Sequence, residues 1–195
     1  MNKPAKVLSI VIPTLYQGNY YNEILKNLDE LWRGKKNEEV EIITIENTLV
    51  NEAWNKWVEQ ATGKYILIIN DDIVIYEKTI ERLMQLLDYC IISCPYFTQK
   101  EDFNLLSTHN RDNLCWFCYM FKVEDKDKLF PIPSDLKLWF WDNWLFYKAE
   151  KNLSWGWRIH HRESKTICAE DKKEYYKRIT ERDEYAWHSF YKLIV

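Results

Sequence analysis

The stretch Ala61-Thr-Gly-Lys-Tyr-Ile-Leu-Ile-Ile-Asn-Asp-Asp72 sets the fold class of this chain. Its centre, residues 65–69, is a continuous apolar run, which is typical of a strand buried on both faces of a parallel sheet. Gly63 stands just before the run, where a left-handed turn can close a preceding helix. The run ends abruptly in three polar residues, 70–72, so the pattern predicts a helix end, a buried strand and a polar turn.

Two further apolar runs precede this stretch, and a helical pattern follows each of them. Residues 7–12 and 40–45 are predicted strands, and residues 21–32 and 51–61 place apolar side chains at helical spacing. The order strand, helix, strand, helix, strand is typical of right-handed crossovers in a parallel sheet. The sequence therefore predicts an α/β fold with a mainly parallel sheet and helices on both faces.

Polar residues follow all three predicted strands. Pro13 and Thr14 follow the first strand, Glu46 and Asn47 the second, and residues 70–72 the third. Ligands of open parallel sheets bind at the carboxyl ends of the strands. We therefore expect these residues to converge on one binding site.

The second half of the chain is less regular. Its periodic segments are three helices and two strands, expected at residues 78–87, 140–149 and 172–193 and at residues 89–94 and 114–123. Residues 97–113 and 130–138 are expected to form loops. No internal repeat or linker divides the chain, so one domain is expected.

Composition restricts the class of protein. The 195 residues carry 27 Lys and Arg against 30 Asp and Glu, so the formal charge of -3 argues against a nucleic-acid partner. Five cysteines, with CxxC spacing only at Cys115 and Cys118, favour reduced thiols in a cytoplasmic protein. No segment reads as a signal peptide or a transmembrane helix. The sequence leaves the oligomeric state open.

Two carboxylates, Asp71 and Asp72, stand side by side directly after an apolar strand. They repel each other unless a cation or hydrogen-bond donors offset the charge. Mg2+ and Mn2+ take one or two protein carboxylates and complete their shell with phosphate oxygens and water. The alternative is a solvated turn in which one of the two caps the next helix. Their place among three polar strand ends favours the metal.

Other kinds of chemistry lack their motifs. The chain has no Walker loop and no GxGxxG, so a bound phosphate would depend on a cation for much of its neutralisation. No serine stands in a nucleophile elbow, and covalent catalysis is not expected. The ten tryptophans either fill the core or form an aromatic platform for sugar rings and bases, and both readings stay open.

Four segments, in order, resemble family 2 glycosyltransferases with the GT-A fold. The opening strand of that family resembles Val7-Leu-Ser-Ile-Val-Ile-Pro-Thr14, and its next helix, strand and acidic metal-binding turn resemble residues 53–72. The later acidic motif that supplies a general base is similar to Trp141-Asp142-Asn-Trp-Leu-Phe146. The segment that closes over the diphosphate resembles His161-Arg-Glu-Ser164-Lys-Thr166.

The resemblance implies a metal-dependent, inverting glycosyltransferase. Such an enzyme moves a sugar from a UDP, dTDP or GDP sugar to a hydroxyl of a glycan or another acceptor. The resemblance implies Asp142 as the catalytic base, and Asp72 and His161 as ligands of Mn2+ or Mg2+. The expected nucleotide-sugar contacts are Pro13, Thr14, Glu46, Asn47, Asn55, Asn70, Asp71 and Lys165. The expected parts of the single domain, residues 1–195, are a nucleotide-sugar-binding half at 1–95, an acceptor half at 96–170 and a C-terminal helix at 171–195.

The chain departs from the family pattern at several points. Glu46 stands where Asp is usual, Trp57 where Gly is usual, and the turn at residues 70–72 reads Asn-Asp-Asp rather than Asp-x-Asp. The segment after Glu46 is short, so a strand and a helix of the usual fold are expected to be missing. His160 stays open as an alternative to His161. A nucleotidyltransferase and a non-catalytic sugar-binding module stay open as alternative functions.

Overall fold

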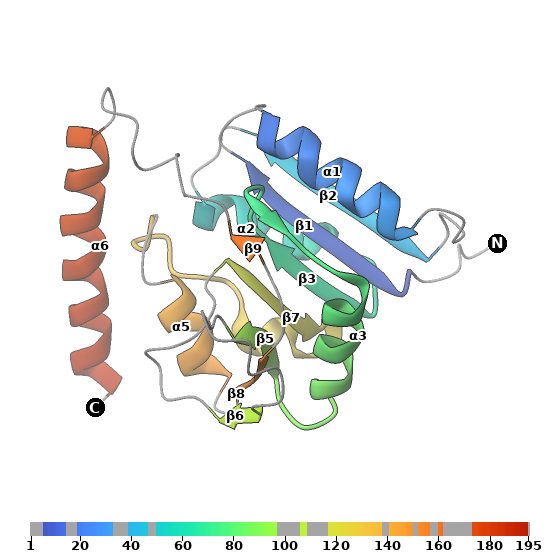
Figure 1. Ribbon diagram of the computed structural model, residues 1–195. Helices are drawn as coiled ribbons and strands as arrows, with labels where there is room; N and C mark the ends of the chain where they lie inside the picture. The colour runs from blue at the N-terminus through green and yellow to red at the C-terminus, as the bar shows by residue number, and fades with distance from the viewer. Residues whose placement is uncertain are drawn as a thin grey trace.

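The computed structural model describes residues 6–14, 19–32, 39–46, 50–96, 106–108, 117–137, 141–149, 152–156, 160–161 and 173–194. For Glu46, Asp142, His160 and His161 the description covers the backbone and not the side chain. Figure 1 shows a twisted sheet with helices on both faces and one long helix standing at the side.

The main sheet has seven strands: β1 Leu8–Thr14, β2 Val40–Glu46, β3 Tyr65–Ile69, β5 Ile92–Tyr96, β6 Leu106–Thr108, β7 Cys118–Lys122 and β8 Asn152–Gly156. Their order across the sheet is β2-β1-β3-β7-β5-β8-β6. β1 runs parallel to β2 and β3, and β5 runs parallel to β8. β7 and β6 pair antiparallel with their neighbours, so five of the seven strands share one direction. The prediction of a mainly parallel α/β sheet is confirmed.

Two helices link the first three strands and cover opposite faces of the sheet. α1 (Asn19–Trp32) leads from β1 to β2, and α2 (Val50–Gln60) leads back past β1 to β3. Right-handed crossovers in opposite directions place their helices on opposite faces. Figure 1 shows α1 in front of the sheet and α2 behind it. These five elements all lie within two residues of their predicted bounds.

Large rings fill the space between α2 and the sheet. Trp54 and Trp57 are fully buried on the inner side of α2, and the Trp54 ring centroid lies 5.5 Å from that of Tyr119 in β7. Tyr119 stacks on Phe121, two residues further along the strand, at 6.5 Å. These two tryptophans are therefore core residues, and the bulk of Trp57 is accommodated inside the fold.

A polar network closes the amino edge of the sheet. Glu41 accepts hydrogen bonds from Ser9 Oγ and from the backbone N–H of Thr62, the latter at 2.6 Å. Burial alone would raise the pKa of Glu41, but these hydrogen bonds hold it below its ordinary value. Ser9 Oγ also accepts the Gly63 N–H at 2.8 Å. A Cβ on Gly63 would lie 2.5 Å from Ser9 N, so the close approach of β1 requires glycine there.

In the second half of the chain, the helices match the sequence predictions better than the strands do. The helices are α3 (Glu77–Leu86), α5 (Trp141–Lys148) and α6 (Lys173–Ile194), all near their predicted bounds, and a short α4 (Lys126–Leu129), which was not predicted. β6 lies inside residues 97–113, where a loop was expected, so that expectation was wrong. The strands β8, β4 (Ile73–Val74) and β9 (His160–His161) were also missed. Strands of two residues show no period that a sequence pattern could reveal.

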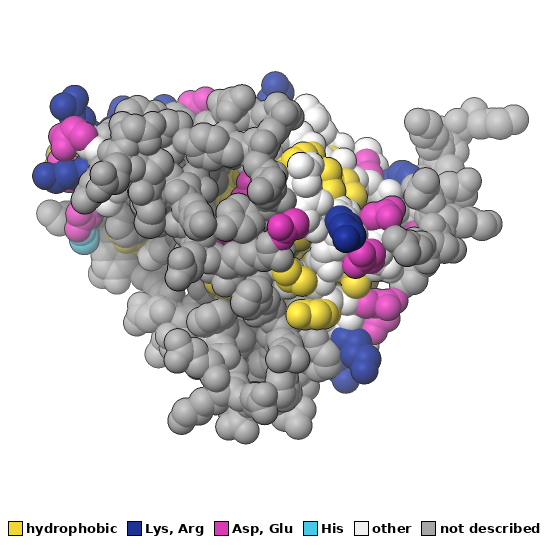
Figure 2. Space-filling model, turned by 45° about the horizontal axis from the view of Figure 1, so that its top comes forward, with side chains coloured by type: hydrophobic (Ala, Val, Ile, Leu, Met, Phe, Trp, Pro, Cys, Tyr) yellow, Lys and Arg dark blue, Asp and Glu magenta, His cyan; other side chains and the backbone are white. Residues whose placement is uncertain are grey.

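The long helix α6 is fixed to the body by a buried carboxylate. Asp183 is fully buried, and its Oδ1 accepts the backbone N–H of Lys137 at 2.9 Å. Trp187, one turn further along α6, is also buried. In Figure 2 the described surface of α6, at the left, carries acidic and basic side chains together. No helix in the described part of the chain is both long and apolar enough to cross a membrane.

Candidate active site

Three hydrogen bonds fix the acidic turn between β3 and β4. The Asn70 N–H donates to Phe117 O at 3.0 Å, and Thr14 Oγ1 donates to Asp71 Oδ2 at 2.6 Å. The Ile75 N–H, just after β4, donates to Asn27 Oδ1 on α1 at 3.1 Å. The turn is therefore held from β1, from the start of β7 and from α1.

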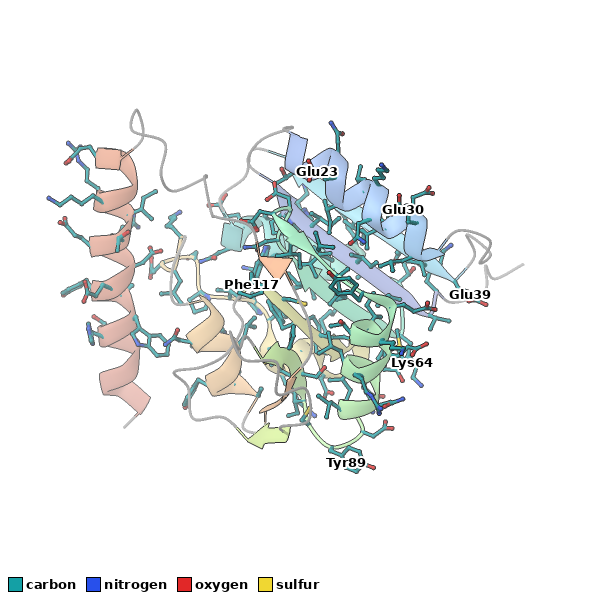
Figure 3. The ribbon with its side chains drawn as sticks, in the orientation of Figure 1. Glu23, Glu30, Glu39, Lys64, Tyr89 and Phe117 are labelled. Atoms are coloured by element: carbon teal, nitrogen blue, oxygen red, sulfur yellow. The ribbon has the colours of Figure 1, made fainter. Side chains whose placement is uncertain are left out.

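The predicted convergence of strand ends is present in the backbone. Thr14 and Glu46 are register partners at the ends of β1 and β2, and the Thr14 side chain reaches across to Asp71 after β3. Pro13 is one residue back from this edge. Figure 3 marks Glu39 and Lys64, which precede β2 and β3, at the opposite edge from the acidic turn. Asn47 lies outside the described residues, so its role stays a prediction.

The two carboxylates of the turn differ in their surroundings. Burial raises the pKa of Asp71 above its ordinary value, the Thr14 hydroxyl lowers it in part, and the Asp72 charge raises it further. Asp72 is 8% exposed. Two carboxylates held together in a largely buried turn disfavour the doubly charged state, and a cation would offset that cost.

The turn and the predicted histidine ligand lie on paired strands. β4 pairs antiparallel with β9, with Ile73 opposite His161 and Val74 opposite His160. The backbone of His161 is therefore opposite the residue that follows Asp72, although the two are far apart in the sequence. The choice of His161 over His160 as a ligand stays a prediction.

The residues fit a divalent cation in their chemistry. Carboxylate oxygens and an imidazole are ligands that Mn2+ accepts, and hard cations complete their shell with phosphate and water. Within the described residues no group of three or more His, Cys, Asp or Glu side chains is arranged to hold a metal ion. Asp72 would supply one carboxylate, and the rest of the shell would come from His161, donor phosphates and water.

Asn55 has a structural role that the sequence did not reveal. Its Nδ2 donates to Ile132 O at 2.8 Å, and its Oδ1 accepts the Ile132 N–H at 2.7 Å. Both ends of the amide are thus engaged by a segment 77 residues away. Glu52 lies about one turn earlier on α2, and its Oε1 is 3.3 Å from Lys137 Nζ. Residues 132–137 therefore contact α2 at two points. A nucleotide contact by Asn55 stays a prediction.

Asp142 is the second residue of α5, in the helix that the sequence predicted. Leu145 on the same helix and Ala149 directly after it are buried in the core, and Trp144 packs against the core. This packing fixes the helix that carries Asp142, whose role as the base stays a prediction. Lys165 lies outside the described residues.

Several residues near the site carried no signal in the sequence. The Phe117 carbonyl accepts the Asn70 N–H, and the Asn27 side chain accepts the Ile75 N–H just after β4. No motif encodes either hydrogen bond. Asn51, in the first turn of α2, is 2% exposed, and neither atom of its amide group has a hydrogen-bond partner in the described structure. Buried polar groups of this kind are uncommon in native proteins and cost free energy.

Known proteins share this architecture. The model of glycosyl transferase family 2 matches residues 18–184. A search of curated proteins finds no match. Among solved structures, S. aureus TarS 1–349 in complex with UDP-GlcNAc aligns with a TM-score of 0.55 and 14% identity over 76% of this chain and 55% of that chain. This chain therefore spans little more than half of TarS 1–349.

Two other solved structures have a similar fold. A mutant of Drosophila beta-1,4-galactosyltransferase 7, in complex with manganese, UDP-Gal and xylobiose, aligns with a TM-score of 0.60 and 8% identity over 84% of this chain and 74% of that chain. A197 from STIV aligns with a TM-score of 0.54 and 13% identity, over 80% of this chain and 85% of that chain. The family match over most of the length, on a sheet of this topology, shows that the chain belongs to glycosyl transferase family 2 and has the GT-A fold.

Proposed function

We propose that this chain transfers a glycosyl group from a nucleotide-diphosphate sugar to an acceptor hydroxyl, with Mn2+ or Mg2+ and with inversion at the anomeric carbon. One observation carries the proposal: the Thr14–Asp71 hydrogen bond joins the carboxyl ends of β1 and β3 and holds two carboxylates at the edge where such sheets bind ligands. Family membership supports glycosyl transfer. The UDP-GlcNAc complex of TarS supports a nucleotide-sugar donor, with UDP, dTDP and GDP sugars as the candidates.

The donor would lie along the carboxyl edge of β1, β2 and β3. Its nucleotide would contact Pro13, Thr14, Glu46 and the acidic turn, with Asn47, Asn55 and Lys165 as further candidates. Asp72 and His161 would hold the cation, which neutralises charge on the departing diphosphate when it is bound. Residues 96–170 would supply the acceptor side, where a glycan or another hydroxyl compound would bind.

The transfer step needs one base. The proton of the acceptor hydroxyl passes to the Asp142 carboxylate as the acceptor oxygen bonds to the anomeric carbon. The bond from that carbon to the diphosphate oxygen breaks, and the diphosphate leaves with the electron pair. Because the acceptor attacks opposite the leaving group in one displacement, the configuration inverts.

A donor panel tests the proposal. The folded protein is incubated with UDP, dTDP and GDP sugars and Mn2+, and the release of free sugar and nucleoside diphosphate is measured. At least one donor is expected to turn over, and turnover is expected to stop with EDTA and in Asp72→Ala. The matched control is Asp88→Ala, which removes an exposed carboxylate 3.3 Å from Lys122.

Other outcomes separate the alternatives. Binding of a nucleotide sugar without turnover of any donor would support a non-catalytic sugar-binding module. Formation of a nucleotide sugar from a nucleoside triphosphate and a sugar phosphate would support a nucleotidyltransferase. A cytoplasmic location is part of the proposal, and the buried thiols of Cys90, Cys94 and Cys118 are compatible with it.

A further inference from the structure

Asn27 connects α1 to the backbone just after β4, although α1 supplies none of the expected ligands. Its Oδ1 accepts the Ile75 N–H at 3.1 Å across 48 residues of sequence. Ile75 is fully buried. A buried backbone donor needs a partner, and at this position Asn27 supplies it.

The strand that Asn27 holds is small and isolated from the main sheet. β4 has two residues and pairs only with the two residues of β9 within the described structure. A ladder of this size contributes few hydrogen bonds of its own, so its place depends on anchors at its ends. The Thr14–Asp71 bond lies before β4, and the Asn27–Ile75 bond lies directly after it.

The same two-stranded ribbon joins the proposed ligands. Asp72 immediately precedes β4, and His161 lies in β9 opposite Ile73. A shift of β4 would therefore move Asp72 and the backbone of His161 together. Groups that orient metal ligands commonly change metal affinity when they are removed, even though they do not touch the metal.

We infer that Asn27 is a positioning residue for the cation site, through its hydrogen bond to the backbone that follows β4. The inference rests on the proposed function, because it concerns the same cation. Asn27 contacts neither substrate nor metal in this scheme. It fixes the backbone that follows β4 relative to α1 before any ligand arrives.

The experiment measures Mn2+ affinity in the absence of nucleotide, so no turnover is required. Asn27→Ala removes the acceptor, and Asn27→Asp keeps an acceptor oxygen in its place. Mn2+ is titrated by electron paramagnetic resonance into each folded protein, and folding is checked by circular dichroism. We expect Asn27→Ala to weaken Mn2+ binding by about 10- to 100-fold and Asn27→Asp to stay near the wild type.

A structural control separates positioning from general destabilisation. Ser93 Oγ donates to Leu83 O at 2.9 Å inside the core, between β5 and α3. Ser93→Ala also removes a hydrogen bond between a side chain and the backbone of a buried segment. It is expected to lower the melting temperature and to leave Mn2+ affinity unchanged. If Asn27→Ala does not fold, Asn27→Gln keeps the amide and displaces its oxygen by one methylene, and weaker Mn2+ binding is expected again.

The outcomes are distinguishable. Equal Mn2+ affinity in the wild type and Asn27→Ala, or in Asn27→Gln where it replaces Asn27→Ala, overturns the inference and leaves the proposed function standing. Equal losses in Asn27→Ala and Asn27→Asp also overturn it, because the acceptor oxygen would then not be the cause. An equal loss of Mn2+ affinity in Ser93→Ala overturns it as well, because general destabilisation would explain the effect. No Mn2+ binding by the wild type contradicts both the inference and the metal dependence of the proposed function.

Discussion

At the scale of single residues, the site and the opposite edge of the sheet each hold a carboxylate with a shifted pKa, and the two shifts have opposite signs. Burial raises the pKa of Asp71, and the Asp72 charge adds to the effect. Hydrogen bonds from Ser9, Thr62 and Gly63 lower the pKa of Glu41 against the effect of burial. Opposite shifts predict opposite dependences of stability on pH.

Asp71→Asn is expected to stabilise the protein at neutral pH. With a raised pKa, folded Asp71 binds its proton more tightly than the unfolded chain does, so stability falls as pH rises from about 4 through the folded pKa. Asparagine removes that cost and can still accept the Thr14 hydrogen bond. Thermal unfolding between pH 3 and 8 checks this, and a stabilisation that persists undiminished at pH 3 would contradict it.

Glu41→Gln is the control, because its effect on stability at neutral pH is expected to be opposite to that of Asp71→Asn. With a lowered pKa, the Glu41 carboxylate contributes stability above the unfolded pKa, near pH 4.3, and that contribution is lost as pH falls through the folded pKa. The variant is therefore expected to be less stable than the wild type at neutral pH, with the difference shrinking in acid. A constant difference across this range would show that the charge is not the cause.

Two asparagines on α2 form a matched pair for a second prediction. Asn51 and Asn55 lie one turn apart, and the amide of Asn55 makes two hydrogen bonds with Ile132 whereas that of Asn51 makes none in the described structure. Asn55→Leu is expected to cost about 1–3 kcal/mol, because buried backbone groups of Ile132 lose their partners. Asn51→Leu is expected to be neutral or stabilising. Urea unfolding measures both, and an equal loss in the two variants would contradict the assignment.

At the scale of elements, residues 130–137 connect α2 to α6 without forming a helix or a strand of their own. Ile132 bonds to Asn55 on α2, and Lys137 donates to Asp183 on α6. The loop therefore links α2 and α6 through hydrogen bonds, and its position determines where α6 packs.

Asp183→Ala is expected to loosen α6. The Lys137 N–H would lose its buried acceptor, which is expected to cost about 1–3 kcal/mol of unfolding free energy. Glu184→Ala is the control, because Glu184 is exposed and lies 3.9 Å from His188 on the same helix. Limited proteolysis near α6 together with thermal unfolding checks the pair, and equal behaviour of the two variants would contradict the role of Asp183.

The elements also show what a sequence pattern can and cannot predict. β1, β2 and β3 were predictable because each is an apolar run bounded by polar residues or proline. β4 and β9 were not, because a two-residue strand is defined by its partner and not by its own composition. The convergence of strand ends followed from the parallel topology, whereas the Asn27 and Asn55 contacts depend on distances between segments that no local pattern encodes.

At the scale of the whole molecule, the chain uses the GT-A architecture with its acidic turn at one edge of the sheet and α5 as the carrier of the proposed base. Asp142→Asn keeps the volume of the side chain and removes its charge. Transfer is expected to slow by about 100-fold or more, with nucleotide-sugar affinity nearly unchanged, because a base acts on the acceptor proton and not on donor binding. A wild-type rate in this variant would show that another residue is the base, and Asp135 would be the next carboxylate to test.

Calorimetric titration of the folded protein with UDP, GDP and dTDP, with and without Mn2+, tests the central claim most directly. The claim is that a nucleoside diphosphate binds at the carboxyl edge of β1 and β3 through a cation held by Asp72. The account predicts that at least one of the three binds, that Mn2+ strengthens the binding, and that Asp72→Ala loses the Mn2+ effect while Asp71→Ala loses less of it. No binding of any of the three in the presence of Mn2+, or the same Mn2+-dependent binding in Asp72→Ala as in the wild type, would contradict it.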